Sequence, residues 1–336
     1  MICHIVTGAT GFVGKNLVLR LLNLNEKKII IIVGRTRPIY LDNFPEFKKR
    51  FQFINFDLTK STFLKFPRGF EVDTVYHCAG VATLTAKWDV LWKTNVKGTV
   101  DLIEWISEAS KIRQVVFISS ISACGYEVSS AGGFSKQNSI TSPNLNNPYG
   151  KSKQQAERKL DALAKKLNFH LTVVRPSYIF GPEMRGNAGF SQFIEVVKKR
   201  SFYARINYPG TLSFTYIDNF ISFLILIKSN TDSSSDYFFS DSEPIEYVEL
   251  FRVIGEISGK EIQPISFPQM VFSFFSFLLI CYCKMFSAKT RTPVFLLPLL
   301  CAEVSQINFD KVKTEHKSCI SVTLEEGLKK TISFRN

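Results

Sequence analysis

A glycine-rich turn near the start of the chain constrains the fold more than any other sequence feature. It lies between a short apolar run, residues 2–6, and an amphipathic run, residues 14–23, which predict a strand and a helix. In a unit of this kind the three glycines permit a tight turn, close approach of a pyrophosphate to the backbone, and close packing of the helix. The turn therefore predicts a dinucleotide site at the helix N-terminus. The residues expected to form it are Gly8, Thr10, Gly11, Phe12, Val13 and Gly14.

Strand and helix patterns then alternate over the first half of the chain. Runs rich in β-branched or aromatic residues predict strands, and apolar residues at helical spacing predict helices. Alternation of this kind requires right-handed crossovers and produces a parallel sheet with helices on both faces. The expected fold is α/β, a doubly wound parallel sheet of the Rossmann type. The predicted strands are 28–33, 51–56, 74–78, 114–119 and 171–174, and the predicted helices are 88–110 and 149–167.

After the last of these strands, the alternation of strand and helix patterns becomes irregular. Residues 1–175 are expected to form the NAD(P)-binding Rossmann domain, and residues 176–336 a smaller C-terminal substrate lobe with some segments returning to the Rossmann domain. Within this plan, 126–148 predicts a loop rich in Ser, Asn, Gly and Pro, and 229–236 predicts a polar linker.

Charge and cysteine content indicate which binding partners and which cellular compartment to expect. The net charge of +13 favours anionic partners, such as phosphate-bearing cofactors, nucleotide-linked substrates or acidic lipids. No nucleic-acid signature accompanies the basic residues, so a nucleic-acid partner is not expected. The seven cysteines are odd in number and scattered, and no secretory signal opens the chain, which together favour a reducing, cytoplasmic setting.

Two Cys-His pairs, Cys3-His4 and His77-Cys78, lie on strands that are expected to be neighbours. Consecutive strand residues point to opposite faces of a sheet, so each pair is split and four ligands cannot converge on one ion. No metal site is expected.

Tyr149 and Lys153 carry the predicted chemistry. A separation of four residues places both side chains on one face of the helix predicted at 149–167. The ammonium is then expected to lower the pKa of the phenol. Such a tyrosine exchanges a proton with a substrate hydroxyl or carbonyl while a hydride moves to or from a nicotinamide.

The glycine turn followed by Tyr149-Gly-Lys-Ser-Lys153 resembles the extended short-chain dehydrogenase/reductase family. That family includes NAD-dependent nucleotide-sugar epimerases, dehydratases and reductases, as well as members of the 3β-hydroxysteroid dehydrogenase type. The resemblance is good over residues 1 to about 225. Further matching segments are Asp57-Leu58, His77-Cys78-Ala79-Gly80, Asn95-Val-Lys-Gly-Thr99, Ser119-Ser120, Arg175-Pro176-Ser177 and Gly181-Pro182.

The resemblance implies a role for several of these residues. Ser120 holds the substrate oxygen, with Ser122 as the competing candidate, and Lys153 also binds the nicotinamide ribose. Asp57 and Leu58 contact the adenine, and Asn95 supports the geometry of the site. Each has a plainer alternative, because Asp57 could cap a turn and Asn95 could be an amide on a helix surface. Other positions assigned to the cofactor in this way are Ala79, Gly80 and Pro176.

The end of the second predicted strand bears on the choice of cofactor. It reads Val33-Gly34-Arg35, where NAD-selective sites usually offer an acidic residue to the ribose hydroxyls. A planar cation beside a glycine instead suits a 2′-phosphate, which favours NADP. Arg35 could also stack on the adenine of NAD, so NAD and NADP are both candidate cofactors.

The first functional hypothesis is an oxidoreductase acting on a secondary alcohol or ketone of a nucleotide sugar or lipid-like substrate. The alternative is a nucleotide-sugar epimerase that uses bound NAD. A dehydratase is disfavoured, because Ile121 and Ser122 stand where an acidic pair is expected after Ser120. A non-catalytic NADP-binding scaffold is the third hypothesis, and loss of Tyr149 or Lys153 would have indicated it. Basic residues that could meet a diphosphate, or simply be solvated, are Arg185, Lys198, Lys199, Arg200 and Arg205.

Residues 262–283 form an uncharged run rich in Phe, and a second apolar run follows at 293–302. One interpretation is a buried helix over the substrate pocket. The other is peripheral membrane contact through 262–302, and a homodimer is also left open. In the membrane interpretation the apolar group enters the interface and the basic group meets anionic headgroups. The apolar group is Phe272, Phe274, Phe275, Phe277 and Leu278, and the basic group is Lys284, Lys289 and Arg291.

Overall fold

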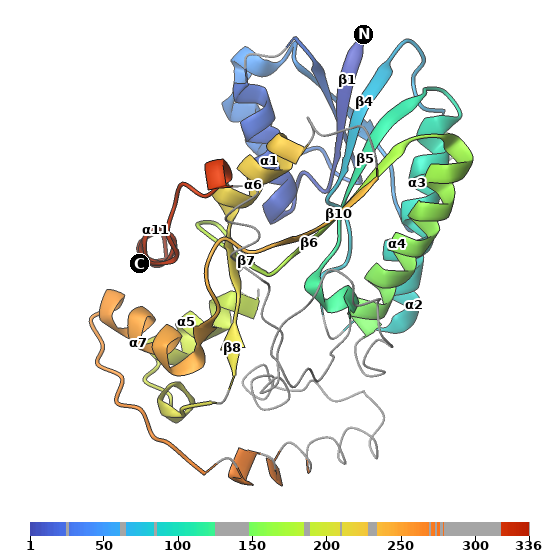
Figure 1. The fold of residues 1–336 in the computed structure, drawn as a ribbon. Helices are drawn as coiled ribbons and strands as arrows, with labels where there is room; N and C mark the ends of the chain where they lie inside the picture. Colours follow the sequence, from blue (N-terminus) through green and yellow to red (C-terminus); the bar gives the residue numbers. More distant parts are fainter. Residues whose placement is uncertain are drawn as a thin grey trace. The chain divides into compact units, whose positions relative to one another are not determined.

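The computed structural model divides into two compact units, which are considered separately (Figure 1). Among the described residues, the first unit comprises 1–124, 148–176 and 220–238, and the second comprises 177–219 and 239–335. The structure describes residues 1–24, 27–60, 65–83, 86–124, 148–184, 189–208, 210–227, 234–268, 270–272, 274, 275, 278 and 317–335.

A seven-stranded sheet forms the centre of the first unit, in the order β10-β6-β5-β4-β1-β2-β3. The pairs β1–β2, β1–β4, β2–β3, β4–β5 and β5–β6 are all parallel. Strands β2 and β3 follow β1 toward one edge of the sheet, and the chain then crosses back so that β4 pairs with the other side of β1, as in a doubly wound fold. The strands are β1 (Ile2–Thr7), β2 (Ile29–Gly34), β3 (Phe51–Asn55), β4 (Glu71–His77), β5 (Ile112–Ile118), β6 (His170–Pro176) and β10 (Ser235–Phe239).

Helices cover both faces of this sheet, with α1 on one face and α3 and α4 on the other (Figure 1). Their apolar residues pack against near-continuous runs of buried Ile and Val from the strands, as parallel sheets require. The predicted Rossmann fold is confirmed. The helices are α1 (Phe12–Asn23), α2 (Trp88–Leu91), α3 (Gly98–Ser107), α4 (Pro148–Leu167) and α6 (Ile217–Leu226), with shorter turns η1 (Ile39–Asn43), η2 (Pro45–Phe47), η3 (Trp92–Lys97) and η4 (Ile121–Cys124).

Two predicted segments differ from the structure. The helix predicted at 88–110 is broken by η3, a π-helical turn, between α2 and α3. The linker predicted at 229–236 is wrong at its end, because Ser235 and Asp236 belong to strand β10, where Asp236 lies 3.0 Å from Arg175. The loop predicted at 126–148 lies almost entirely outside the described residues, which resume at Pro148, the first residue of α4.

The second unit is built from short strands and helices around an aromatic core. Phe180 stacks on Phe190 at 4.7 Å between ring centroids, and Phe214 meets Phe190 edge to face at 5.2 Å. Strands β7 and β9 are parallel, and β8 and β11 are antiparallel. The elements are β7 (Tyr178–Phe180), α5 (Gly189–Lys198), η5 (Phe202–Arg205), β8 (Thr211–Leu212), β9 (Phe214–Tyr216), β11 (Ile245–Glu246), α7 (Tyr247–Ile257), η8 (Lys317–Cys319) and α11 (Leu324–Ser333).

A buried pair, Asn219 and Asp241, ties the C-terminal segment to this unit. The Asn219 amide donates to Asp241 Oδ2 at 2.8 Å and to the Val322 carbonyl oxygen at 2.7 Å. Asn219 Oδ1 accepts from the backbone nitrogens of Ser321 and Val322 at 3.0 and 3.1 Å. Burial raises the pKa of Asp241 to about 7. The segment directly before helix α11 is therefore held in place.

None of the helices within the described residues combines the length and the apolar character that crossing a bilayer requires.

Candidate active site

The glycine turn has the close contacts that its sequence predicts. Gly8 has a positive φ of 70°, and an added Cβ there would lie 2.8 Å from the backbone of Cys78 and Ala79. The Gly11 nitrogen donates to the Gly8 carbonyl oxygen at 2.8 Å. A Cβ on Gly14 would overlap that same carbonyl group. The turn is therefore folded tightly against both the start of α1 and the loop after β4.

The N-terminus of α1 has the properties of an anion site. Gly11 precedes the helix without any side-chain cap, and the first turn contains no acidic residue. The backbone N–H groups of the first turn then carry the positive end of the helix dipole. Phe12 and Val13 lie in this turn and Thr10 is exposed beside it, so these residues fit a cofactor diphosphate. Tyr40 donates to the Ala9 carbonyl oxygen at 3.1 Å and steadies the turn.

A chain of buried hydrogen bonds connects this turn to η3. The Ala79 nitrogen donates to Thr7 Oγ1 at 3.0 Å, and Thr7 Oγ1 lies 2.8 Å from His77 Nδ1. His77 Nε2 lies 2.8 Å from Thr99 Oγ1, whose hydroxyl donates to the Asn95 carbonyl oxygen at 2.7 Å. Because the Thr99 proton is committed to Asn95, Nε2 must donate and Nδ1 must accept. Burial lowers the pKa of His77 to about 3, so the ring is neutral.

Asn95 is buried, which excludes the alternative of a surface amide. Its Oδ1 accepts from the Val81 nitrogen at 2.7 Å, and its Nδ2 donates to the Val81 carbonyl oxygen at 3.0 Å and to Ser152 Oγ at 3.0 Å. Ser152 donates in turn to the Tyr149 carbonyl oxygen at 2.7 Å. An added Cβ on Gly80 would lie 3.1 Å from Asn95 Oδ1. Asn95 thereby joins the loop after β4 to the first turn of α4.

Ser120 and Tyr149 share a side-chain hydrogen bond. Ser120 follows β5 and Tyr149 begins α4, so the carboxyl end of the sheet brings the two hydroxyls together. Ser120 Oγ also accepts from the Ser122 nitrogen at 3.2 Å, which makes Ser122 a backbone donor to Ser120. The hydrogen bond to Tyr149 thus supports Ser120 over Ser122.

The prediction that Lys153 lowers the pKa of Tyr149 is wrong in this structure. Burial raises the pKa of Tyr149 to about 12, and the hydrogen bond from Ser120 opposes that rise only in part. The Lys153 ammonium donates instead to the Ile118 carbonyl oxygen at 2.7 Å and lies 4.8 Å from the centre of the Phe117 ring. Burial lowers the pKa of Lys153 itself to about 8, against the attraction of Glu157.

Glu157 continues the Tyr149 and Lys153 face of α4 by one more turn. Its carboxylate accepts from Arg175 Nε at 3.0 Å and Nη2 at 2.7 Å, and from the Ser119 hydroxyl. The Glu157 carboxylate and the Arg175 guanidinium are both buried, so each charge offsets the cost of removing the other from water. The cluster fixes the end of β5, where Ser120 follows, against the end of β6, where Pro176 is buried.

The residues assigned to the adenosine end lie where β2 and β3 end. Asp57 Oδ1 accepts from the Thr59 nitrogen at 2.9 Å and from its hydroxyl at 2.8 Å, so Asp57 does cap a turn, and these bonds hold its pKa below the usual range. Leu58 packs against Gly98 of α3. Arg35 is exposed, and its charge also lowers the pKa of Asp57. Arg37 is paired with Asp42 at 2.7 Å.

Several residues of this site had no role assigned from the sequence. Thr7 ends β1, and His77, Thr99 and Arg175 stand in motifs whose role was left unstated. Glu157 could have been found, since Tyr149, Lys153 and Glu157 recur every four residues on one helical face. Several predicted residues lie outside the described ones: Arg185, Phe277, Lys284, Lys289, Arg291 and the run at 293–302. Within them, no three His, Cys, Asp or Glu side chains gather in a way that could hold a metal ion.

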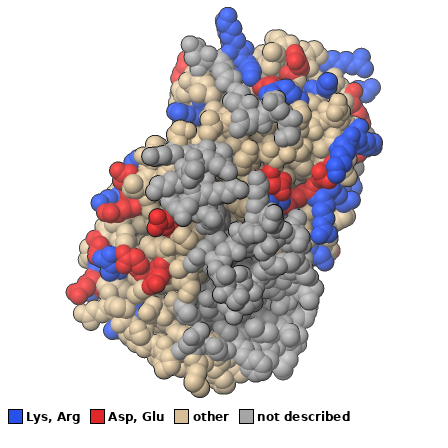
Figure 2. Space-filling view, viewed as in Figure 1, with Lys and Arg blue, Asp and Glu red and all other residues tan. Residues whose placement is uncertain are grey.

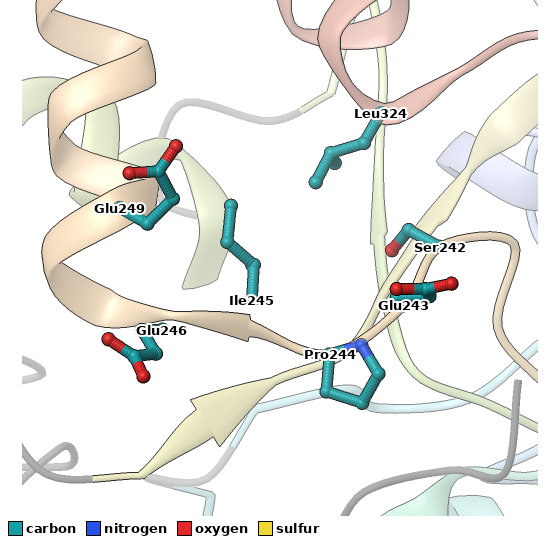
Figure 3. A pocket seen from close by; sticks show the side chains of 7 residues that line it. All are labelled: Ser242, Glu243, Pro244, Ile245, Glu246, Glu249 and Leu324. Atoms are coloured by element: carbon teal, nitrogen blue, oxygen red, sulfur yellow. The ribbon is translucent and has the colours of Figure 1, made fainter.

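A separate pocket in the second unit has a volume of about 510 Å³. Ile245 from β11 and Leu324 from α11 point toward its hollow (Figure 3). The carboxylates at its rim disfavour a diphosphate, because like charges repel (Figure 2). None of the residues predicted for the cofactor lines it. The lining residues are Ser242, Glu243, Pro244, Ile245, Glu246, Glu249 and Leu324.

Comparisons with known proteins agree with this geometry. The chain is 28% identical over 264 residues to UDP-glucose 4-epimerase of Vibrio cholerae, covering 75% of this chain and 74% of that protein. It is 24% identical over 306 residues to 3beta-hydroxysteroid-dehydrogenase/decarboxylase isoform 1 of Arabidopsis thaliana, covering 84% of this chain and 66% of that protein. In fold it resembles UDP-glucuronic acid 4-epimerase of Bacillus cereus, solved with NAD, with a TM-score of 0.72 and 19% identity over 99% of this chain and 98% of that one.

A family model covers most of the chain. Residues 4–237 match the model of the NAD dependent epimerase/dehydratase family, and this span contains the glycine turn, Ser120, Tyr149 and Lys153. The chain is therefore an NAD-dependent enzyme of the extended short-chain dehydrogenase/reductase type and belongs to the NAD dependent epimerase/dehydratase family.

Proposed function

We propose that this enzyme is a nucleotide-sugar epimerase that inverts a secondary alcohol carbon of the sugar by way of a ketone. The observation that carries the proposal is the hydrogen-bonded Ser120–Tyr149 pair, beside Lys153, at the same end of the sheet as the anion site of α1. The epimerases among the relatives support this alternative over the net oxidoreductase that the sequence placed first.

The chain's own groups have separate tasks in such a reaction. The bound nicotinamide supplies a hydride acceptor that can return the hydride to the opposite face of the sugar carbon. Tyr149 removes the hydroxyl proton as the ketone forms and gives it back as the alcohol reforms. Ser120 holds the substrate oxygen through a hydrogen bond. Lys153 binds the ribose of the cofactor and supplies positive charge when Tyr149 is deprotonated.

Net oxidation or reduction is the second candidate. The hydroxysteroid dehydrogenase/decarboxylase among the relatives favours it, as does Arg35 in place of an acid at the end of β2. Dehydration stays disfavoured, because Ile121 and Ser122 follow Ser120. The second unit is proposed to supply the sugar contacts. A nucleotide-linked substrate, together with buried or half-buried free thiols such as Cys3 and Cys78, supports a cytoplasmic setting.

The test is to incubate the full chain with a panel of UDP-linked hexoses, hexosamines and uronic acids, and separately with sterol-like alcohols. With NAD present in a small amount relative to the sugar, an epimerase converts many equivalents of substrate and accumulates no NADH. A net oxidoreductase stops when the cofactor is consumed. Stoichiometric NADH with a keto product would overturn the epimerase proposal, and Ser120→Ala serves as the inactive control.

Arg35 is expected to strengthen the binding of NADP and to contribute little to the binding of NAD. Its guanidinium can form charge-assisted hydrogen bonds with a 2′-phosphate that NAD lacks. Arg35→Ala should reduce affinity for NADP about tenfold while changing affinity for NAD little. Calorimetric titration with both cofactors measures this. Arg37→Ala is the matched control, because Arg37 is already paired with Asp42 and stacks on Phe51. Equal losses of affinity for NADP and for NAD in Arg35→Ala would refute the expectation.

A further inference from the structure

Large apolar side chains are exposed on two neighbouring segments of the second unit. Single exposed apolar residues are normal in proteins, but a cluster needs a reason. Here Met270 is 82% exposed, Phe274 58% and Phe275 52%. These side chains are called the aromatic face. Its members are Phe202, Tyr203, Phe267, Met270, Phe274, Phe275 and Leu278.

Backbone hydrogen bonds hold the two segments together. The Ile265 nitrogen donates to the Arg205 carbonyl oxygen at 2.6 Å, and the Asn207 nitrogen donates to the Ile265 carbonyl oxygen at 3.0 Å. Tyr208 packs against Phe272, with 6.1 Å between ring centroids. Phe202 and Tyr203 on one segment and the described residues from Phe267 to Phe275 on the other therefore lie in one local region, fixed to the unit through the buried rings of Tyr208 and Phe272.

Basic residues flank one segment of the aromatic face in the sequence. Lys198, Lys199 and Arg200 end α5 directly before Phe202, and Arg205 ends η5. The neighbouring acids are fewer: Glu195, which lies 3.6 Å from Lys199, and Glu261. An apolar surface flanked by basic residues matches an anionic lipid headgroup layer over hydrocarbon.

We propose that the aromatic face docks the protein on the surface of an anionic phospholipid bilayer, with its rings in the interface and the flanking Lys and Arg side chains at the headgroups. The face lies parallel to the membrane and does not cross it. The inference rests on exposure and charge in the second unit and does not depend on the reaction proposed above. Docking of this kind would place the enzyme where lipid-linked or amphipathic substrates are concentrated.

Cosedimentation of the full chain with vesicles tests the proposal. We expect binding to vesicles of phosphatidylcholine mixed with phosphatidylglycerol at low salt, and weaker binding at high salt or to phosphatidylcholine alone, because salt screens the flanking basic residues. Phe274→Ser combined with Phe275→Ser should lower the partition coefficient by about tenfold or more. Phe334→Ser is the matched control, because Phe334 is also 58% exposed but lies after α11, outside the aromatic face.

Thermal unfolding and NAD titration of each variant confirm that the fold and the cofactor site are retained. Recovery of wild-type protein in the supernatant with both vesicle types would overturn the proposal. So would equal sedimentation of wild type and the Phe274/Phe275 double variant. If the wild type instead self-associates in lipid-free buffer, and the double variant does not, the face binds a second copy of the chain and the membrane proposal fails.

Discussion

Replacing Tyr149 with phenylalanine is expected to lower turnover by about 100-fold or more and to leave the affinity for NAD unchanged. The substitution removes only the hydroxyl that hydrogen-bonds Ser120, and the ring keeps its place at the start of α4. Since burial raises the pKa of Tyr149 to about 12, the deprotonated fraction grows with pH below that value. Wild-type kcat/KM should therefore rise with pH in the oxidative half-reaction, and the variant should lose this dependence.

Steady-state kinetics across pH, together with NAD titration, measure both parts of this expectation. Tyr208→Phe is a suitable control, because it removes a buried tyrosine hydroxyl in the second unit, where Tyr208 packs against Tyr247 and Phe272. Near wild-type turnover by Tyr149→Phe on an identified substrate would show that the proton passes through another group.

Replacing Lys153 with methionine is expected to reduce turnover as strongly and also to weaken cofactor binding, while making the folded protein more stable at pH 7. The folded-state pKa of Lys153 is about 8 and its usual value is 10.5. Between these values the unfolded chain binds more protons, so wild-type stability rises with pH across this window. Below pH 8 the buried ammonium therefore costs stability, with a ceiling of about 3 kcal/mol. The net gain is smaller, because the Ile118 carbonyl oxygen loses its donor.

Thermal unfolding followed from pH 7 to 10.5 separates these effects. The difference in Tm between Lys153→Met and wild type should be largest at pH 7 and shrink as the pH rises. Lys151→Met is the matched control, because Lys151 is exposed on the same helix beside the Trp88 ring, and it should show no such trend. A variant that is less stable than wild type at every pH would mean that the hydrogen bond to Ile118 outweighs the cost of burying the charge.

Local sequence patterns were sufficient to predict most of the first unit. The strands predicted at 28–33, 51–56 and 114–119 match β2, β3 and β5 to within two residues, because their β-branched and aromatic residues favour strands. The glycine turn was equally informative, since Gly8 and Gly14 occupy positions where a Cβ would meet backbone atoms. Both features are local, so neighbouring residues suffice to reveal them.

The features that the sequence patterns did not predict depend on tertiary contacts. The pKa of Tyr149 depends on burial and on where the Lys153 ammonium points, and helical spacing alone predicted only that the two side chains share a face. His77 was matched to a motif without a role, because its partners Thr7 and Thr99 are 70 and 22 residues away in sequence. The start of strand β10, Ser235 and Asp236, was hidden in a polar run, since pairing with β6 and not apolar character places these two residues in the sheet.

The π-helical turn at η3 bears on how such a site arises in evolution. A turn of this kind holds one residue more than an α-helical turn, and each residue of an α-helix advances by about 100°. One added codon therefore rotates α2 relative to α3, so that Asn95 reaches Val81 and Ser152 while Leu102 and Ile106 stay in the core. Deleting one codon of this turn would rotate Asn95 away from Val81 and Ser152 without substituting any of the remaining side chains. Insertion or deletion of a single residue is therefore a route by which this contact can be gained or lost, alongside substitution of the asparagine itself.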